Sequence, residues 1–324
     1  MARTLDSLLD ETLKRKASDL HLKVGRPPLY RTHGELIPSE DEPMTHEELQ
    51  GLFTPVMNDL QQKKYTEQLE VDFAYRLRDE ARFRVNLFHQ MGTSSAVLRH
   101  IPLTIPSLDD LGLPEILKEL VMRKQGLILF TGATGSGKST SMAAMVSYLN
   151  QNAQRHVITV EDPVEFVHED RKCSITQREI GTDTPNLLSA LKMALRQDPD
   201  VILMGEMRNL EEMEMGMMAA ETGHVVFSTL HTNDAKQTID RIVDTFPADK
   251  VKPLRTLLST TLLAVVSQRL LPRADGEGRI AALEIMVNSP HISELIAEGD
   301  INAIEEAIKN SDKFYKMQSF NQAL

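Results

Sequence analysis

The sequence of 324 residues contains one cysteine, Cys173, and no tryptophan. A single cysteine excludes an intramolecular disulfide and a structural zinc site built from cysteines, and it is typical of proteins of the reducing cytosol. Aromatic residues make up only 5% of the chain, which argues against a platform that stacks nucleic-acid bases. Because the formal net charge is −11, we do not expect a basic surface for nucleic acid either.

Long apolar runs are missing as well. Stretches such as 262–266 are far shorter than the roughly 20 residues that a helix needs to cross a bilayer. The first residues include Arg3, Asp6 and Asp10 and no apolar core of a signal peptide. We therefore expect no direct insertion into a membrane, so that any membrane association would come through a partner protein.

The N-terminal third of the chain predicts a mixed α+β domain over residues 1–102. Thr4 and Thr45 stand where helix N-caps are expected, and Thr45 with Glu48 forms a capping-box pattern. Alternating segments predict strands at 19–24, 29–32, 71–77, 81–89 and 96–101. Residues 103–114, which include Pro106 and Pro114, predict a linker because proline disfavours continued helix or central strand.

The pattern changes in residues 115–280. Near-continuous apolar segments at 127–130, 157–160, 201–204 and 225–227 alternate with helical segments. This alternation is typical of an α/β domain with a largely parallel sheet covered on both faces. Residues 281–324 predict one more strand and then a mostly helical extension.

Residues 132–140, GATGSGKST, fit the phosphate-binding pattern G-x-x-x-x-G-K-[ST] in full, between a predicted strand and a predicted helix. The glycines let backbone N–H groups face an anion, and the helix N-terminus adds partial positive charge. Lys138 would contact the β- and γ-phosphates and the Ser139 hydroxyl would bind Mg²⁺, so the predicted cofactors are ATP and Mg²⁺. The predicted nucleotide-binding residues are Gly132, Ala133, Thr134, Gly135, Ser136, Gly137, Lys138, Ser139 and Thr140.

Three predicted strands end in side chains that could act on a bound nucleotide. Strand 201–204 leads to Glu206, strand 157–160 leads to Glu161, Asp162 and Glu165, and strand 225–230 leads to His231. The carboxyl ends of such strands form the ligand-binding edge of an α/β sheet. From the residues alone, each acid could also be a solvated loop charge, and the histidine could be a partly buried side chain without a catalytic role.

Residues 81–87 alternate with a period of two. Phe83 and Val85 are predicted to face a core, while Arg82 and Arg84 share the opposite face. Two arginines on one strand face can bind an anion, or they can form an ordinary solvated face. The alternation alone leaves both interpretations open.

Four segments together resemble the secretion-superfamily hexameric ATPases, most closely the PilT/PilU group of type IV pilus retraction ATPases. They are GATGSGKST (132–140), ITVEDPVEFVH (158–168), LRQDPDVILMGEMRN (195–209) and ETGHVVFSTLHTNDA (221–235). Residues 17–38, 81–90, 241–250 and 317–324 also resemble segments of this group. The resemblance implies a RecA-like P-loop ATPase domain with a smaller α+β PAS-like N-terminal domain.

The resemblance also implies roles for the strand-end residues. Glu165 corresponds to the glutamate proposed as general base for the attacking water. Glu206 corresponds to the Walker B glutamate, which organises Mg²⁺ and its water, and His231 to the histidine of the fourth segment, the His box. Which of the two glutamates takes the proton stays open.

For the arginines the resemblance implies a homohexameric ring. Arg82 and Arg84 would move onto the nucleotide, and Arg196 and Arg241 would lie at subunit interfaces and reach toward neighbouring phosphate sites. The implied function is Mg²⁺-dependent ATP hydrolysis that powers pilus retraction and twitching motility. The expected location is the cytoplasmic face of the inner membrane, and the expected partners are an inner-membrane platform protein and a paralogous motor ATPase.

One segment departs from the group. Where its retraction ATPases usually carry Ala-Ile-Arg-Asn, this chain has residues 291–294, His-Ile-Ser-Glu. The alternative function is therefore an accessory, PilU-like subunit that binds nucleotide, joins a principal motor and hydrolyses little by itself. A P-loop phosphotransferase acting on a small substrate is a third function, for which the sequence predicts no second substrate pocket. A single cysteine cannot build the four-cysteine zinc module of the extension and type II secretion ATPases.

Overall fold

The computed structural model describes residues 3–78, 80–101, 104–274 and 278–323. By its internal contacts the chain divides into two compact units, each described here by itself. The first holds the residues up to Thr104 together with segments 163–167 and 181–183, and the second holds the remainder. The predicted boundary between residues 102 and 103 lies outside the described residues, and the division into domains stays a prediction.

The first unit is a six-stranded antiparallel sheet with helices packed on one face. Its strands, in spatial order, are β3 (Glu35–Pro38), β2 (Leu29–Thr32), β1 (Asp19–Lys23), β6 (Thr93–Ile101), β5 (Ala81–Gln90) and β4 (Glu70–Leu77). Its helical segments are α1 (Leu5–Lys14), α2 (His46–Phe53), η1 (Thr54–Val56) and α3 (Asp59–Gln68). The sequence misses β3 because all four of its residues are exposed, so that no alternation of burial marks it.

The helix starts predicted in this unit are confirmed. The Thr4 hydroxyl accepts a hydrogen bond from the backbone N–H of Ser7 at 3.2 Å, and α1 begins at the next residue, Leu5. The Thr45 hydroxyl accepts from the N–H of Glu48 at 3.1 Å, and Glu48 accepts in return from the N–H of Thr45. These caps satisfy backbone donors that a helix leaves unpaired at its first turn.

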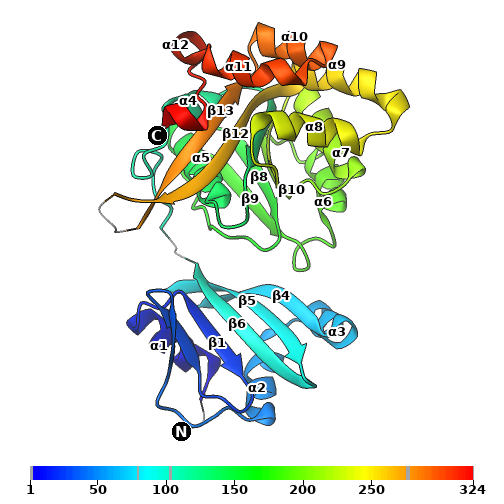
Figure 1. The fold of residues 1–324 in the computed structure, drawn as a ribbon. Helices are drawn as coiled ribbons and strands as arrows, with labels where there is room; N and C mark the ends of the chain where they lie inside the picture. The colour runs from blue at the N-terminus through cyan, green and yellow to red at the C-terminus, as the bar shows by residue number, and fades with distance from the viewer. Residues whose placement is uncertain (1–2, 79, 102–103, 275–277, 324) are drawn as a thin grey trace. The chain divides into compact units, whose positions relative to one another are not determined.

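The second unit contains a seven-stranded sheet that carries the phosphate-binding loop. Its strands, in spatial order, are β13 (Arg279–Val287), β12 (Leu262–Pro272), β7 (Gly126–Thr131), β11 (Val225–Leu230), β10 (Val201–Glu206), β8 (His156–Glu161) and β9 (Ser174–Glu179). Neighbouring strands are parallel except for β12 and β13, which are antiparallel. The predicted largely parallel sheet is therefore observed (Figure 1).

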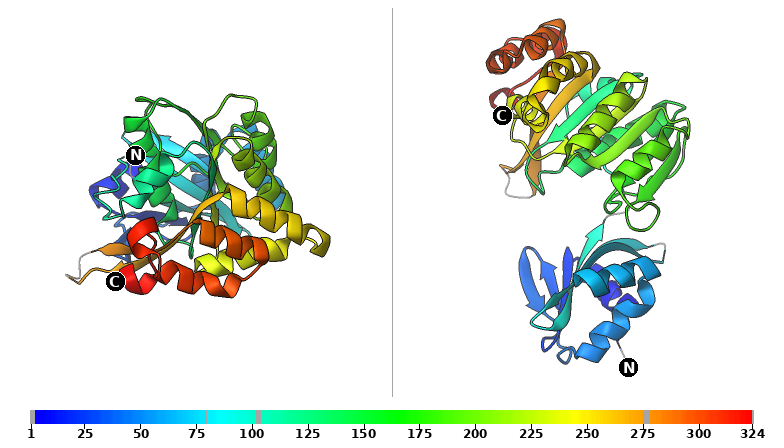
Figure 2. Two further views of the ribbon diagram at one scale, coloured as in Figure 1. Left: turned by 90° about the horizontal axis from the view of Figure 1, so that it is seen from above. Right: turned by 90° about the vertical axis from the view of Figure 1, so that its right-hand side faces the viewer.

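Helices cover both faces of this sheet, as Figures 1 and 2 show. The helices on one face are α6 (Leu187–Ala194), α7 (Leu210–Glu221), α8 (Ala235–Thr245), α9 (Val251–Thr261), α10 (Pro290–Glu298) and α11 (Ile304–Lys309). The other face carries α4 (Ile116–Val121) and α5 (Lys138–Asn152). Shorter segments are η2 (Ala248–Lys250), η3 (Ile301–Ala303), α12 (Asp312–Tyr315) and α13 (Phe320–Ala323). Among the described residues, no helix is long and apolar enough to cross a membrane.

Strand β12 is the main element of this unit that the sequence does not predict. It follows α9 directly, with no glycine or proline between them, so no breaker marks the change from helix to strand. Its partner β13 begins at Arg279 and pairs with it along its length. The predicted C-terminal segment, 281–324, therefore begins inside a sheet strand, and its helical part begins with α10.

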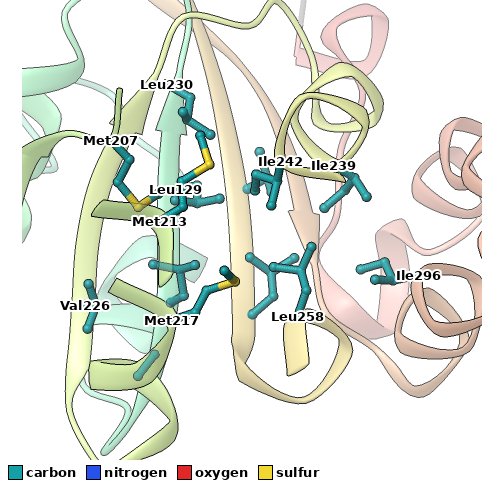
Figure 3. Packing of buried hydrophobic residues seen from close by; sticks show 14 of the residues in the cluster. Leu129, Met207, Met213, Met217, Val226, Leu230, Ile239, Ile242, Leu258 and Ile296 are labelled. Atoms are coloured by element: carbon teal, nitrogen blue, oxygen red, sulfur yellow. The ribbon is translucent and has the colours of Figure 1, made fainter. Parts of the chain in front are cut away.

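The methionines of segment 207–218 recur at helical spacing, which predicts packing rather than a flexible binding surface. Met207, Met213 and Met217 are at most 2% exposed and belong to the core between the sheet and α7 to α9. Figure 3 shows their side chains among Leu129, Leu258 and their neighbours. Only Met218 of this set is exposed, at 40%, so the stretch mainly serves the core.

We expect Met217→Ala to lower the free energy of unfolding by about 3 kcal/mol, because it opens a cavity in a core that cannot fully collapse. The measurement is chemical denaturation followed by circular dichroism. Met218→Ala is the matched control, since its exposed side chain should cost less than about 0.5 kcal/mol. Equal losses in the two variants would contradict the assignment of Met217 to the core.

Candidate functional site: the phosphate-binding loop and the strand ends beside it

The predicted phosphate-binding loop joins β7, a central strand whose residues are all buried, to the N-terminus of α5. Gly132, its first residue, has φ +137°, and Gly137, the N-cap of α5, has φ +89°. Both are conformations that L side chains rarely adopt. Glycine at these two positions therefore lets the chain bend sharply between β7 and α5, and the N-terminus of a helix that follows such a loop is a common anion site.

Two side chains of the loop fit a bound phosphate. Lys138, 9% exposed, donates from Nζ to the carbonyl oxygens of Gly132 at 2.7 Å and Ala133 at 3.0 Å. Ser136 Oγ is buried and has no hydrogen-bond partner among the described residues. A phosphate oxygen is a stronger acceptor than a carbonyl, so a phosphate bound in the loop would draw Lys138 from the loop's own backbone, and Ser136 has a donor to spare for it.

Both end glycines of the loop lie against Gln268, on the neighbouring strand β12. A Cβ atom on Gly132 would lie 2.4 Å from the carbonyl oxygen of Gln268, and one on Gly137 would lie 2.7 Å from its Nε2. Glycine is therefore required at position 132 by close approach to a backbone atom as well as by φ, whereas at position 137 the requirement comes mainly from φ. No sequence pattern marks Gln268, because only the pairing of two distant strands places it here.

The carboxylate of Glu206 is aimed by an irregularity in its strand. Leu203 pairs with Phe227 and Glu206 pairs with Thr229, so β10 contains one residue more than β11 between these pairs. Ser228 Oγ donates to the carbonyl oxygen of Gly205 at 2.9 Å within this bulge. Bulges redirect side chains at strand ends beside active sites, and this one turns the last residue of β10.

Two basic side chains lie against Glu206, which is 25% exposed. Arg208 Nε donates to Oε2 at 2.9 Å, and His231 Nε2 lies 3.4 Å from Oε1. The hydrogen bond to Glu206 raises the pKa of Arg208 above its ordinary value, and the charges of Glu206, Asp162 and Glu212 add to the effect. The structure thus brings Glu206 and His231 together, as predicted, and adds Arg208, a base two residues after the acid.

The three acids of segment 158–168 take different positions. Glu161 accepts from Thr159 Oγ1 at 2.6 Å and from Gln177 Nε2 at 3.4 Å, which holds it at the end of β8. Asp162 is exposed. Glu165 is half-buried and lies in segment 163–167, which groups by its contacts with the first unit. Its predicted role as general base stays a prediction.

The predicted arginines lie on exposed or half-exposed surfaces. On β5, Phe83 and Val85 are buried while Arg82 and Arg84 are partly exposed, so the predicted alternation is confirmed, and Arg84 Nε lies 3.6 Å from Asp72. Arg196, just after α6, and Arg241, on α8, are exposed. The described residues show no ion pair for these last two side chains, and the roles of all four arginines stay predictions.

A magnesium ion at this site would take few ligands from the protein. Among the described residues, no three His, Cys, Asp or Glu side chains converge as a metal site. Mg²⁺ at nucleotide sites is usually held by one or two side chains, by water and by the phosphates of the substrate. Ser139, half-buried in the first turn of α5, and Glu206 are the side chains that could hold it.

Over residues 1–323 the chain matches the protein family described as type II/IV secretion system protein. The chain belongs to this family. Its resemblance to the secretion-superfamily ATPases is thereby confirmed.

This type II/IV secretion system protein is similar to two curated proteins of Pseudomonas aeruginosa along nearly its whole length. It is 45% identical to the type IV pilus retraction ATPase PilT over 99% of this chain and 92% of that protein. It is 42% identical to the type IV pilus ATPase PilU over 98% of this chain and 83% of that protein.

Among solved structures, the family member is similar to a crystal structure of the pilus retraction motor PilT with bound ADP. The TM-score is 0.90 at 42% identity, over 99% of this chain and 96% of that one. The predicted fold class, a RecA-like P-loop domain with a smaller α+β domain, is confirmed by this match and by the family match.

Proposed function

We propose that this chain is a Mg²⁺-dependent ATP hydrolase that works as a homohexameric ring motor and powers the retraction of type IV pili. The observation that carries the proposal is the phosphate-binding loop with Glu206 and His231 at neighbouring strand ends of the same sheet. The similarity to PilT over nearly the full length of both chains supports pilus retraction as the process.

In this proposal residues 132–140 bind the phosphates of ATP, and Lys138 offsets charge on the β- and γ-phosphates. Ser139 and Glu206 would hold Mg²⁺, which when bound offsets charge on the phosphate oxygens. A water molecule attacks the γ-phosphate in line, Glu165 or Glu206 accepts its proton, and the bond from the γ-phosphorus to the β,γ-bridging oxygen breaks, so that ADP leaves. His231, 3.4 Å from Glu206, would orient that carboxylate.

We also infer that the ring completes the site. Arg82 and Arg84 would bind the nucleotide from an N-terminal domain over 1–102, joined by a linker over 103–114 to the ATPase domain over 115–280. Arg196 and Arg241, both exposed, would reach phosphate sites of neighbouring subunits, and an arginine supplied across an interface couples hydrolysis to assembly. The proposed location is the cytoplasmic face of the inner membrane, with a platform protein and a paralogous motor as partners.

The departure at residues 291–294 favours a second candidate, an accessory subunit that hydrolyses little by itself. His291 and Glu294 are exposed on α10, so the altered positions are available to a partner. The similarity to PilU also supports this candidate. The unchanged loop and strand-end acids favour the autonomous motor.

The test is Mg²⁺-dependent phosphate release by the full chain over a range of protein concentrations. For a self-assembling motor, specific activity should rise with concentration, and Arg241→Ala should remove most of the rise without preventing ADP binding. Lys236→Ala, an exchange of another cationic side chain on α8, is the matched control. Background activity at every concentration, with ATP still bound, would instead favour the accessory subunit.

A further inference from the structure

Strand β12 runs beside the phosphate-binding loop as well as beside β7. The two strands are parallel, with Ser267 opposite Thr131, and Thr131 Oγ1 donates to Ser267 Oγ at 2.9 Å. β7 ends at Thr131, whereas β12 continues to Pro272. The next residue of β12, Gln268, therefore lies at the point where the loop begins.

Gln268 contacts both ends of the loop and the helix that follows. Its main-chain oxygen closely approaches Gly132 and its Nε2 closely approaches Gly137. Its Oε1 accepts a hydrogen bond of 2.8 Å from Ser141 Oγ, in the first turn of α5. One residue thus spans the loop from its first glycine to the helix N-terminus.

Packing alone does not explain a glutamine here. Gln268 is 2% exposed and Ser141 is 1% exposed, and Ala264 and Val266, on the same face of β12, belong to an apolar core cluster. Burying a carboxamide is unfavourable unless its polar atoms are satisfied, and a leucine would fill this space without that requirement. The polar side chain therefore serves the loop and α5.

We propose that Gln268 is a positioning residue of the nucleotide site: its main-chain oxygen and carboxamide hold the phosphate-binding loop and the start of α5 in the conformation that receives phosphate. The inference rests on the proposed function insofar as this loop binds nucleotide. It extends that function because a residue of β12 fixes the conformation of the loop, while the loop itself provides the contacts with phosphate.

Two substitutions of Gln268 separate positioning from packing in the full chain. Gln268→Leu removes both polar side-chain atoms at similar volume, including the acceptor of the buried hydrogen bond from Ser141. It should weaken binding of a fluorescent ADP analogue about tenfold, the usual cost of leaving a buried polar group unsatisfied. Gln268→Glu keeps the acceptor for Ser141 but places an anion beside the loop. It should weaken ADP binding further at pH 8 and less at pH 6, because protonation of the new carboxyl removes the repulsion.

A double-mutant cycle with Ser141→Ala gives the second readout. If Gln268 acts partly through Ser141, the losses in ADP affinity of Gln268→Leu and Ser141→Ala should not add in the double variant. In steady-state hydrolysis the same variants should raise KM by the factor lost in binding. Gln318→Leu is the matched control, because its amide donates to the carbonyl oxygen of Leu283, on β13, rather than to the loop.

The inference is overturned if both Gln268 variants bind ADP like the wild type, or if Gln268→Leu and Gln318→Leu lose affinity equally. Neither of these outcomes bears on ATP hydrolysis by the wild type, so the proposed function would stand. Failure of the wild type to bind any nucleotide would overturn both. Normal ADP binding without hydrolysis would overturn only the autonomous motor, and the cycle would still test Gln268.

Discussion

Replacing Lys138 with alanine is expected to lower ATP hydrolysis about a hundredfold to a thousandfold, the usual effect of removing a preorganised donor from developing negative charge. Lys138 is the first residue of α5, and its ammonium group is buried against the loop. The ammonium group of Lys138 therefore lies inside the loop, where the phosphates of ATP would bind. The measurement is steady-state phosphate release at saturating ATP.

The arginine variant separates charge from shape. Lys138→Arg keeps the positive charge, but a planar guanidinium does not replace a compact ammonium group in a closed loop, so it should remain far below the wild type. Lys192→Ala, on the exposed side of α6, is the control and should hydrolyse normally. Retention of a tenth or more of wild-type hydrolysis by Lys138→Ala would place the reaction at another site.

The phosphate-binding loop could be predicted from the sequence because its information is local. The glycines, Lys138 and Ser139 occur in one run between a strand and a helix, and each position has its own stereochemical reason. The alternation on β5 and the helix caps at Thr4 and Thr45 are equally local. In each case, the residues that decide the structure are near neighbours in the chain.

What the sequence does not reveal depends on contacts between distant segments. Ser141 and Gln268 are 127 positions apart, and only the pairing of β12 with β7 brings them together. The bulge that turns Glu206 exists because β10 and β11 differ by one residue between two paired positions. Arg208 lies within segment 195–209, which resembles the secretion ATPases, but its hydrogen bond to Glu206 follows from that bulge rather than from any spacing rule.

Glu206→Gln is expected to lower kcat about a hundredfold or more, in the range typical of a lost acid–base group, while ADP affinity changes little. The amide keeps the size of the side chain but can neither accept the proton of water nor bind Mg²⁺ as a carboxylate does. Glu206 lies on β10, outside the phosphate-binding loop, which is why binding should persist. Glu211→Gln, an exposed acid in the first turn of α7, is the matched control.

Arg208→Gln is expected to lower the Mg²⁺ concentration that hydrolysis requires, whereas Glu206→Gln should raise it. Arg208 Nε is bonded to Glu206 Oε2, so the guanidinium competes with Mg²⁺ for the same carboxylate. The arginine side chain is 67% exposed, and an exposed pair contributes at most about 1 kcal/mol. The Mg²⁺ concentration for half-maximal hydrolysis should therefore fall about twofold to fivefold.

The two variants together test whether Glu206 holds Mg²⁺ and its water. If it does, Glu206→Gln raises the Mg²⁺ concentration for half-maximal hydrolysis and lowers kcat, whereas Arg208→Gln lowers that concentration and leaves kcat within a few-fold of the wild type. A double variant should behave like Glu206→Gln alone, because Arg208 acts through the carboxylate that is no longer present. Full hydrolysis by Glu206→Gln at normal Mg²⁺ would instead leave Glu165 as the carboxylate that accepts the proton of the attacking water.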